Sequence, residues 1–76
     1  MSSLTYVKLS NNLKCFREKK ALSVADLAFK TNSSCLTIDA IESCNYVPSV
    51  TLALLLSCAL DCSVEDLFHF ELHIED

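Results

Sequence analysis

The side chains best suited to chemistry in this 76-residue chain are five cysteines and two histidines. Four of them, Cys58, Cys62, His69 and His73, follow the pattern C-x3-C-x6-H-x3-H, and zinc prefers both residue types as ligands. The run between the two pairs is shorter than the ~12 residues of the usual zinc finger. On a strand the two histidines would lie ~13 Å apart, since each residue advances ~3.3 Å. One ion could not bind both, so we predict no metal site and no cofactor.

The cysteines offer thiol chemistry instead. Their number is odd and no secretion signal is recognisable, so we expect reduced thiols in a cytoplasmic protein. Neither histidine has a nucleophile at a recognisable spacing, and we predict that the protein is not an enzyme. A thiol switch at Cys35 remains open, the simpler interpretation being that Cys replaces an unneeded polar residue. The longest apolar run, Leu52–Leu56, is too short to cross a membrane at ~20 residues.

Charge divides the chain into two parts. All six basic residues lie in the first thirty positions, where two acidic residues leave a charge of +4. From residue 31 onward there are eight acidic residues and no Lys or Arg, which gives −8. We expect two faces of opposite potential if the fold keeps these parts separate.

Serines that can cap helices divide the sequence into short helical segments, and the absence of Gly favours helices over strand-and-turn folds. Asp26 and Asp66 stand at capping-box positions, and Asn32 suits the left-handed turn that ends a helix. The first helix is expected over roughly 11–20. The expected caps are Ser10, Ser23, Ser34, Ser49 and Ser63.

The two ends of the chain predict strands. Residues 69–74 alternate apolar and polar side chains, and residues 4–9 offer a partner for them. We therefore predict a single domain over residues 1–76, with core helices over 11–68 and a small two-stranded β ribbon formed by the termini.

The segments 23–31 and 34–43 form a helix-turn-helix pattern, two helices joined by a short turn. In order and spacing, the chain resembles the lambda-repressor and Cro-type helix-turn-helix (XRE) family of small bacterial or phage transcription regulators. The resemblance rests on NLKCFREKKALSVADLA, TIDAIE, YVPSVTLALLLSCAL and CSVEDLF. It implies an all-α, five-helix, lambda-repressor-like domain that binds double-stranded DNA. It also implies a charge pair between Arg17 and Glu42 that ties the first helix to the third.

The resemblance makes 34–43 the DNA-reading helix, yet its side chains depart from the family. Where relatives usually carry Gln near the starts of these two helices, this chain has Val24 and Leu36. The reading segment has no Lys or Arg, and phosphate repels Asp39. The residues expected to face the groove are Ser34, Cys35, Leu36, Thr37, Asp39, Ala40 and Ser43.

Phosphate contacts are expected where helices begin, because the amide groups there bind anions. The residues concerned are Ser23 and Val24, together with Asn45. Four lysines are candidates to flank the duplex, and the simpler interpretation is a solvated helix face. These are Lys14, Lys19, Lys20 and Lys30.

The helix that follows Ser49 carries a second apolar stripe beyond the one that faces the core. A helix that is apolar nearly all round is either buried in a crowded core or meets a partner. We predict a homodimer, and the interface residues would be Leu55, Cys58 and Cys62.

Two functions from different classes remain open. The first is a sequence-specific DNA-binding transcriptional regulator, such as a repressor, that acts as a homodimer. The second is a degenerate helix-turn-helix that serves as a protein-interaction module or antirepressor and pairs with another regulator. In the second case the contact residues would be Val24, Phe29, Cys35 and Leu36. The reading-helix side chains favour the second function, and the family resemblance favours the first.

Overall fold

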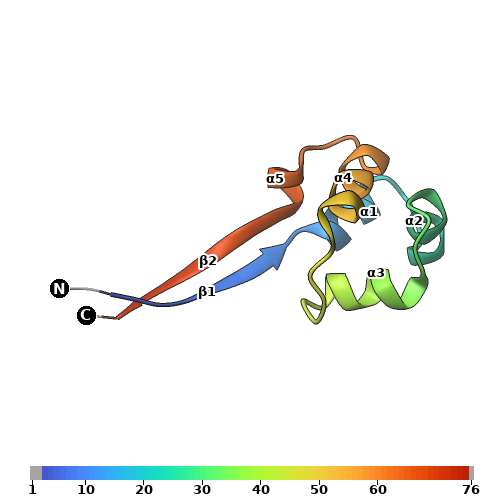
Figure 1. Cartoon of the computed structure of the whole chain (residues 1–76). Coiled ribbons are helices and arrows are strands. Elements are labelled where there is room, and N and C mark those ends of the chain that lie inside the picture. The colour runs from blue at the N-terminus through green and yellow to red at the C-terminus, as the bar shows by residue number, and fades with distance from the viewer. Residues whose placement is uncertain (1–2, 76) are drawn as a thin grey trace.

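A two-stranded ribbon projects from a body of five short helices (Figure 1), which confirms the predicted helices and ribbon. The computed structural model describes the backbone of residues 3–75 and the side chains of residues 8–72. The principal extents of the molecule are 47 × 21 × 20 Å, and the ribbon accounts for the elongation. Within the described residues, no helix has the length and apolar character needed to cross a membrane.

The helices are α1 (Leu13–Lys19), α2 (Val24–Lys30), α3 (Cys35–Glu42), α4 (Val50–Ala59) and α5 (Val64–Leu67). Serine caps the last four as predicted. The hydroxyl oxygens of Ser23, Ser34, Ser49 and Ser63 each accept a backbone N–H three residues further on, at 3.0–3.1 Å. Asp26 and Asp66 complete capping boxes by accepting the backbone N–H of their capping serines at 2.9 and 3.0 Å.

The predicted start of α1 is wrong. Strand β1 (Ser3–Asn11) includes Ser10, which pairs with His69 and so cannot enter a helical turn. The N-cap residue is Asn12, whose side chain makes no capping bond. The carboxamide oxygen of Asn11 instead accepts the N–H of Leu13 at 3.1 Å. Strand pairing therefore continues to the last residue before the helix.

The helices α1 to α4 all end through a left-handed residue. These residues are Ala21, Asn32, Cys44 and Asp61, with φ between 52° and 63°. In each case the N–H of the following residue bonds to a carbonyl five residues back, at 2.8–3.2 Å, which is the Schellman arrangement. The prediction for Asn32 is confirmed. Gly usually occupies this position, and the chain contains none.

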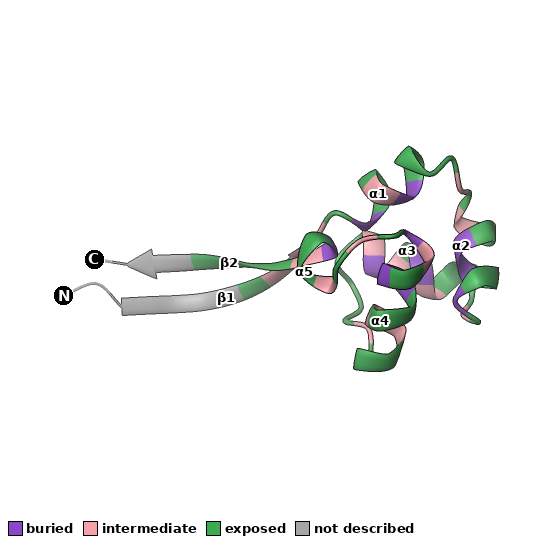
Figure 2. Ribbon diagram, turned by 90° about the horizontal axis from the view of Figure 1, so that it is seen from above, coloured by how far each residue is buried: buried purple, intermediate pink, exposed green. Residues whose placement is uncertain are grey.

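All five helices contribute to one apolar core (Figure 2), with α4 represented also by its C-cap residue, Leu60. Arg17 lies at the core's edge, where its Nε donates to Glu42 Oε2 at 2.6 Å and its Nη2 to Oε1 at 3.2 Å. Both side chains are only 10% exposed, which confirms the predicted charge pair between α1 and α3. The bond to Glu42 raises the pKa of Arg17. The buried apolar residues are Leu13, Leu27, Ala28, Ile38, Ile41, Leu56, Leu60 and Leu67.

The ribbon pairs β1 with β2 (Phe68–Glu75) in antiparallel orientation. Its base is fixed to the helical body by two bonds. The backbone N–H of Asn12 donates to the carbonyl of Leu67 at 2.8 Å, and Asn11 Nδ2 donates to the carbonyl of Ile41 at 2.8 Å. Strand β1 thus leads directly into α1, and β2 follows directly from α5.

Candidate nucleic-acid interface

The helix-turn-helix pair consists of α2 and α3, joined by a turn that hydrogen bonds hold in place. The Thr31 hydroxyl is buried and donates to the carbonyl of Leu27 at 2.8 Å. The N–H of Ser33 donates to the carbonyl of Ala28 at 2.8 Å. Figure 1 shows α3 at the outer edge of the helical body, with one side open. The pair therefore presents α3 on a fixed frame.

The outward surface of α3 contains the side chains that the sequence points to. Cys35, Leu36, Asp39 and Ser43 are exposed, and Leu36 is 82% exposed. Thr37 and Ala40 are half-buried at the rim of this surface, whereas Ile38 and Ile41 pack into the core. The structure thus brings Cys35, Leu36, Asp39 and Ser43 to one exposed side of α3, and it places Thr37 nearer the core.

Several polar groups on this surface are already bonded to the protein. The hydroxyl of Ser34 accepts the N–H of Thr37 at 3.1 Å. The hydroxyl of Ser43 donates to the carbonyl of Asp39 at 2.9 Å and accepts from Asn45 Nδ2 at 3.1 Å. The Asp39 carboxylate forms no ion pair within the described part of the chain. Asp39 is therefore the charge that α3 presents to a ligand.

The two helix starts differ in their suitability for a phosphate. At α2, the Asp26 carboxylate accepts the N–H of Ser23 at 2.9 Å, and this bond lowers the pKa of Asp26. A carboxylate thus already occupies the positive end of α2, beside Ser23 and the half-buried Val24. The first turn of α3 contains no acidic residue. The start of α3 is the less hindered of the two for an anion.

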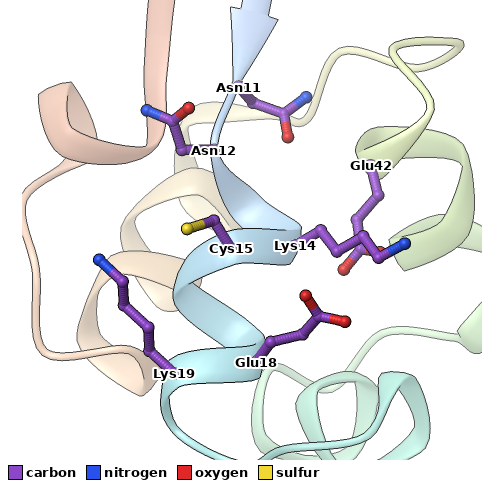
Figure 3. A pocket seen from close by; sticks show the side chains of 7 residues that line it. All are labelled: Asn11, Asn12, Lys14, Cys15, Glu18, Lys19 and Glu42. Carbon is purple, nitrogen blue, oxygen red and sulfur yellow. The ribbon is translucent and has the colours of Figure 1, made fainter.

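The lysines of α1 do not form an unbroken basic surface. Lys14 and Lys19 line an open depression of about 610 Å³ together with Glu18 and Glu42 (Figure 3). Its other lining residues are Asn11, Asn12 and Cys15. The charges there are mixed, which fits a solvated helix face better than a phosphate-binding groove.

Lys20 is used within the protein. Its Nζ lies 2.9 Å from Asp61 Oδ2, in an exposed ion pair between the end of α1 and the end of α4. This pair lowers the pKa of Asp61. It also joins the basic and acidic parts of the chain, so the two charged regions are not fully separated. Lys30 is exposed in the last turn of α2 and remains a candidate to contact a duplex.

The structure places the predicted dimer residues at the surface, but beside a more exposed stripe. Leu55 is 42% exposed, Cys58 is exposed and Cys62 is half-buried. Val50 and Leu54, one turn apart on α4, are 78% and 53% exposed. Sequence reasoning missed this stripe because α4 has no charged residue that marks its outer face.

The thiols differ in their surroundings. Burial, followed by the nearby Asp66 and Asp61 carboxylates, raises the pKa of Cys62, which makes it a poor nucleophile. The other four cysteines are exposed and unbonded to one another. Among the described residues, no three His, Cys, Asp or Glu side chains form a group that could hold a metal ion. The side chain of His73 lies outside the described residues.

No family model matches the chain. The chain is similar to an uncharacterised helix-turn-helix-type transcriptional regulator of Methanocaldococcus jannaschii, with 38% identity over 63 residues. The match covers 83% of this chain and 96% of the relative, so it includes the helix-turn-helix pair and most of the remaining fold.

Proposed function

The chain belongs to the family of helix-turn-helix-type transcriptional regulators, and from this premise we propose that it is a sequence-specific DNA-binding regulator that acts as a homodimer. Its fold would be of the lambda-repressor-like (XRE) class, and a repressor is the role we assign. The proposed partners are double-stranded DNA and a second copy of the chain, with no catalytic step.

The observation that carries the proposal is the exposed outer side of α3 on a fixed frame. Arg17 and Glu42 hold the end of α3, and the buried Thr31 hydroxyl holds the turn before it. A helix so placed can enter a major groove without rearrangement. The residues that would face the groove are Ser34, Cys35, Leu36, Thr37, Asp39, Ala40 and Ser43, with Ser23, Val24 and Asn45 near the phosphates.

The chemistry of this surface determines how DNA would be recognised. Leu36 and Ala40 can contact thymine methyl groups, and no side chain of α3 offers the bidentate donors that recognise guanine. Few phosphates would be neutralised, so affinity should be modest. It should also fall only gradually as salt rises, because the slope against salt scales with the number of neutralised phosphates. Specificity would then depend on DNA shape and on apolar contacts. Two subunits would bind half-sites about one turn, ~34 Å, apart.

A second function is favoured by a different observation. Phe29 on α2 and Leu36 on α3 are 89% and 82% exposed, and the outer side of α3 carries a carboxylate. Exposed apolar groups of this size suit a protein surface. The alternative is an antirepressor that pairs with another regulator through Val24, Phe29, Cys35 and Leu36 and does not bind DNA.

Fluorescence anisotropy tests the proposal, with reduced protein titrated against random-sequence duplex DNA at ~50 and ~200 mM salt. We expect micromolar binding that weakens at the higher salt. Asp39→Asn should tighten binding several-fold, because it removes a negative charge from the groove surface. The matched control is Glu71→Gln, which removes the same charge from the ribbon and should have little effect.

The outcomes separate the two functions. Equal effects of Asp39→Asn and Glu71→Gln would show that α3 does not face the duplex. Absence of binding at ~50 mM salt for wild type and both variants would favour the antirepressor. In that case Phe29→Ala should abolish capture of the partner regulator.

A further inference from the structure

We propose that the apolar side of the terminal ribbon is the surface on which two copies of this chain associate. This side is defined by Leu9 on β1 and by Phe68, Phe70 and Leu72 on β2. The inference rests on the homodimer of the proposed function and names the contact that forms it. It differs from the interface on α4 that the sequence suggests.

The ribbon's apolar side begins in the core and continues beyond it. Side chains two residues apart on a strand point to the same side, so Phe68, Phe70 and Leu72 form one row. Phe68 packs against the core cluster, and Leu9, opposite Phe70, is half-buried. Phe70 and Leu72 are 67% and 61% exposed, because the ribbon leaves the helical body after its base (Figure 2). The helices cover the start of the row and leave the rest bare.

The other side of the ribbon is suited to water. His69 and Glu71 alternate with the apolar row and are exposed. Glu71 lies opposite Lys8 in the register, and opposite charges across a strand pair are favourable. The ribbon therefore has one solvated side and one apolar side, as a sheet does when one side is packed.

The energetics of a ribbon indicate that its apolar side needs cover. A two-stranded ribbon is marginally stable by itself, and independent stability requires more strands or a packed partner. The ribbon projects from the body in both views (Figures 1 and 2). By contrast, α4 is anchored by Leu56 in the core and folds without covering its outer stripe. The ribbon has the greater need of a partner.

A second copy is the partner whose chemistry fits. A two-fold interface brings the same surface of both subunits together, so that surface must suit itself. An apolar row does so, and a row of like charges does not. The chain has a net charge of −4, so two copies repel each other overall, and an uncharged contact surface adds no further repulsion. The row of Leu9, Phe68, Phe70 and Leu72 contains no charge.

Sedimentation equilibrium on reduced full-length protein at ~1–100 µM tests the inference. The test variant carries Phe70→Thr and Leu72→Thr, because Thr keeps strand propensity while the apolar row is lost. The matched control carries His69→Thr and Glu71→Thr on the opposite side of the same strand. We expect dimers for wild type and control, and a dissociation constant at least ~100-fold higher for the test variant. Circular dichroism verifies that each variant is folded.

Three results would overturn the inference. They are a monomeric wild type at ~100 µM, equal weakening by the test and control variants, or loss of the dimer in Leu55→Ser but not in the test variant. If the double variant does not fold, Phe70→Thr with His69→Thr as its control provides the same comparison. If the wild type is monomeric at ~100 µM, the partner that covers the apolar side of the ribbon would be a different protein and not a second copy.

The DNA titration is independent of this measurement. A wild type that dimerises through the ribbon but does not bind DNA would refute the proposed function and leave the inference intact. A wild type that binds DNA as a monomer would refute the inference and the homodimer of the proposed function, and would leave the DNA binding intact.

Discussion

The two sides of the helix-turn-helix pair differ in burial and in how their polar groups are bonded. On the inner side, Ile38 and Ile41 are at most 1% exposed, and Thr31 and Arg17 have bonded partners. Within the described side chains, no buried polar atom lacks a hydrogen-bond partner. On the outer side, Leu36 is 82% exposed and the polar groups bond only to their own helix and its end. The inner side holds the two helices in place. Side chains on the outer side can therefore be replaced, and the ligand they recognise changed, without altering the fold.

Removal of one side chain from each side of α3 should give the largest contrast. Ile38→Ala is expected to lower the free energy of unfolding by about 3 kcal/mol, because it leaves a cavity in a packed core. Leu36→Ala, on the opposite side, should change it by less than about 0.5 kcal/mol. Urea denaturation monitored by circular dichroism measures both. A cost above about 1 kcal/mol for Leu36→Ala would mean that the outer side is packed after all.

Two carboxylates on α3 allow a second comparison. Glu42→Ala leaves the guanidinium of Arg17 without its carboxylate partner in a site that is 10% exposed, and we expect a loss of about 2 kcal/mol because Arg17 keeps its bond to the carbonyl of Leu22. Asp39→Ala removes an exposed carboxylate from the same helix and should leave the urea midpoint nearly unchanged. Comparable losses for the two variants would contradict the structural role assigned to the Arg17 pair.

The capping boxes should give the smallest effect, visible in the pH dependence of stability. Hydrogen bonds from Ser23 lower the pKa of Asp26, and those from Ser63 lower the pKa of Asp66. Because the folded pKa is depressed, this stabilisation is present above the unfolded pKa of about 3.9 and is lost as the pH falls below it. Wild type should therefore have a higher Tm than a variant with Asp26→Asn and Asp66→Asn at pH ~6.

The gap in Tm between wild type and this variant should narrow as the pH falls below the unfolded pKa of about 3.9 and through the lowered folded pKa values of the two carboxyls. Asp39→Asn, an exposed carboxylate in the middle of α3 and outside both capping boxes, is the control and should show no such closing gap. A gap that is constant across this pH range would mean that the carboxylates contribute nothing as charged caps.

The frame was predictable from the sequence because its signals are local. A serine followed by an acidic residue three positions on identifies the starts of α2 and α5, and alternation in 69–74 identifies β2. Arg17 and Glu42 were expected to pair from the family pattern alone. The start of α1 was missed because Ser10 suits both a cap and a strand, and only the pairing with His69 decides between them.

The ligand-facing surfaces were predictable only in part. The groove-facing residues follow from helical spacing once Ile38 and Ile41 are assigned to the core. The outer stripe of α4 does not follow from helical spacing, because every position from Val50 to Leu56 is apolar or Thr. Which of these side chains is buried depends on how α4 is rotated against its neighbours. The exposure of Phe70 and Leu72 depends on where the ribbon leaves the helical body, and no local sequence pattern indicates that point.

The left-handed residues that follow helices α1 to α4 bear on how many destabilising substitutions this protein can tolerate. Ala21 and Cys44 occupy a conformation that costs a residue with a Cβ about 1–2 kcal/mol, whereas Gly adopts it without strain. Gly at either position should therefore add stability, by up to about 1 kcal/mol each after the entropy of the more flexible unfolded chain is deducted. Both positions lie outside the core and outside the groove-facing set. The stability added by these two substitutions would offset destabilising substitutions on α3. A new DNA sequence preference could then be evolved or engineered without loss of the fold.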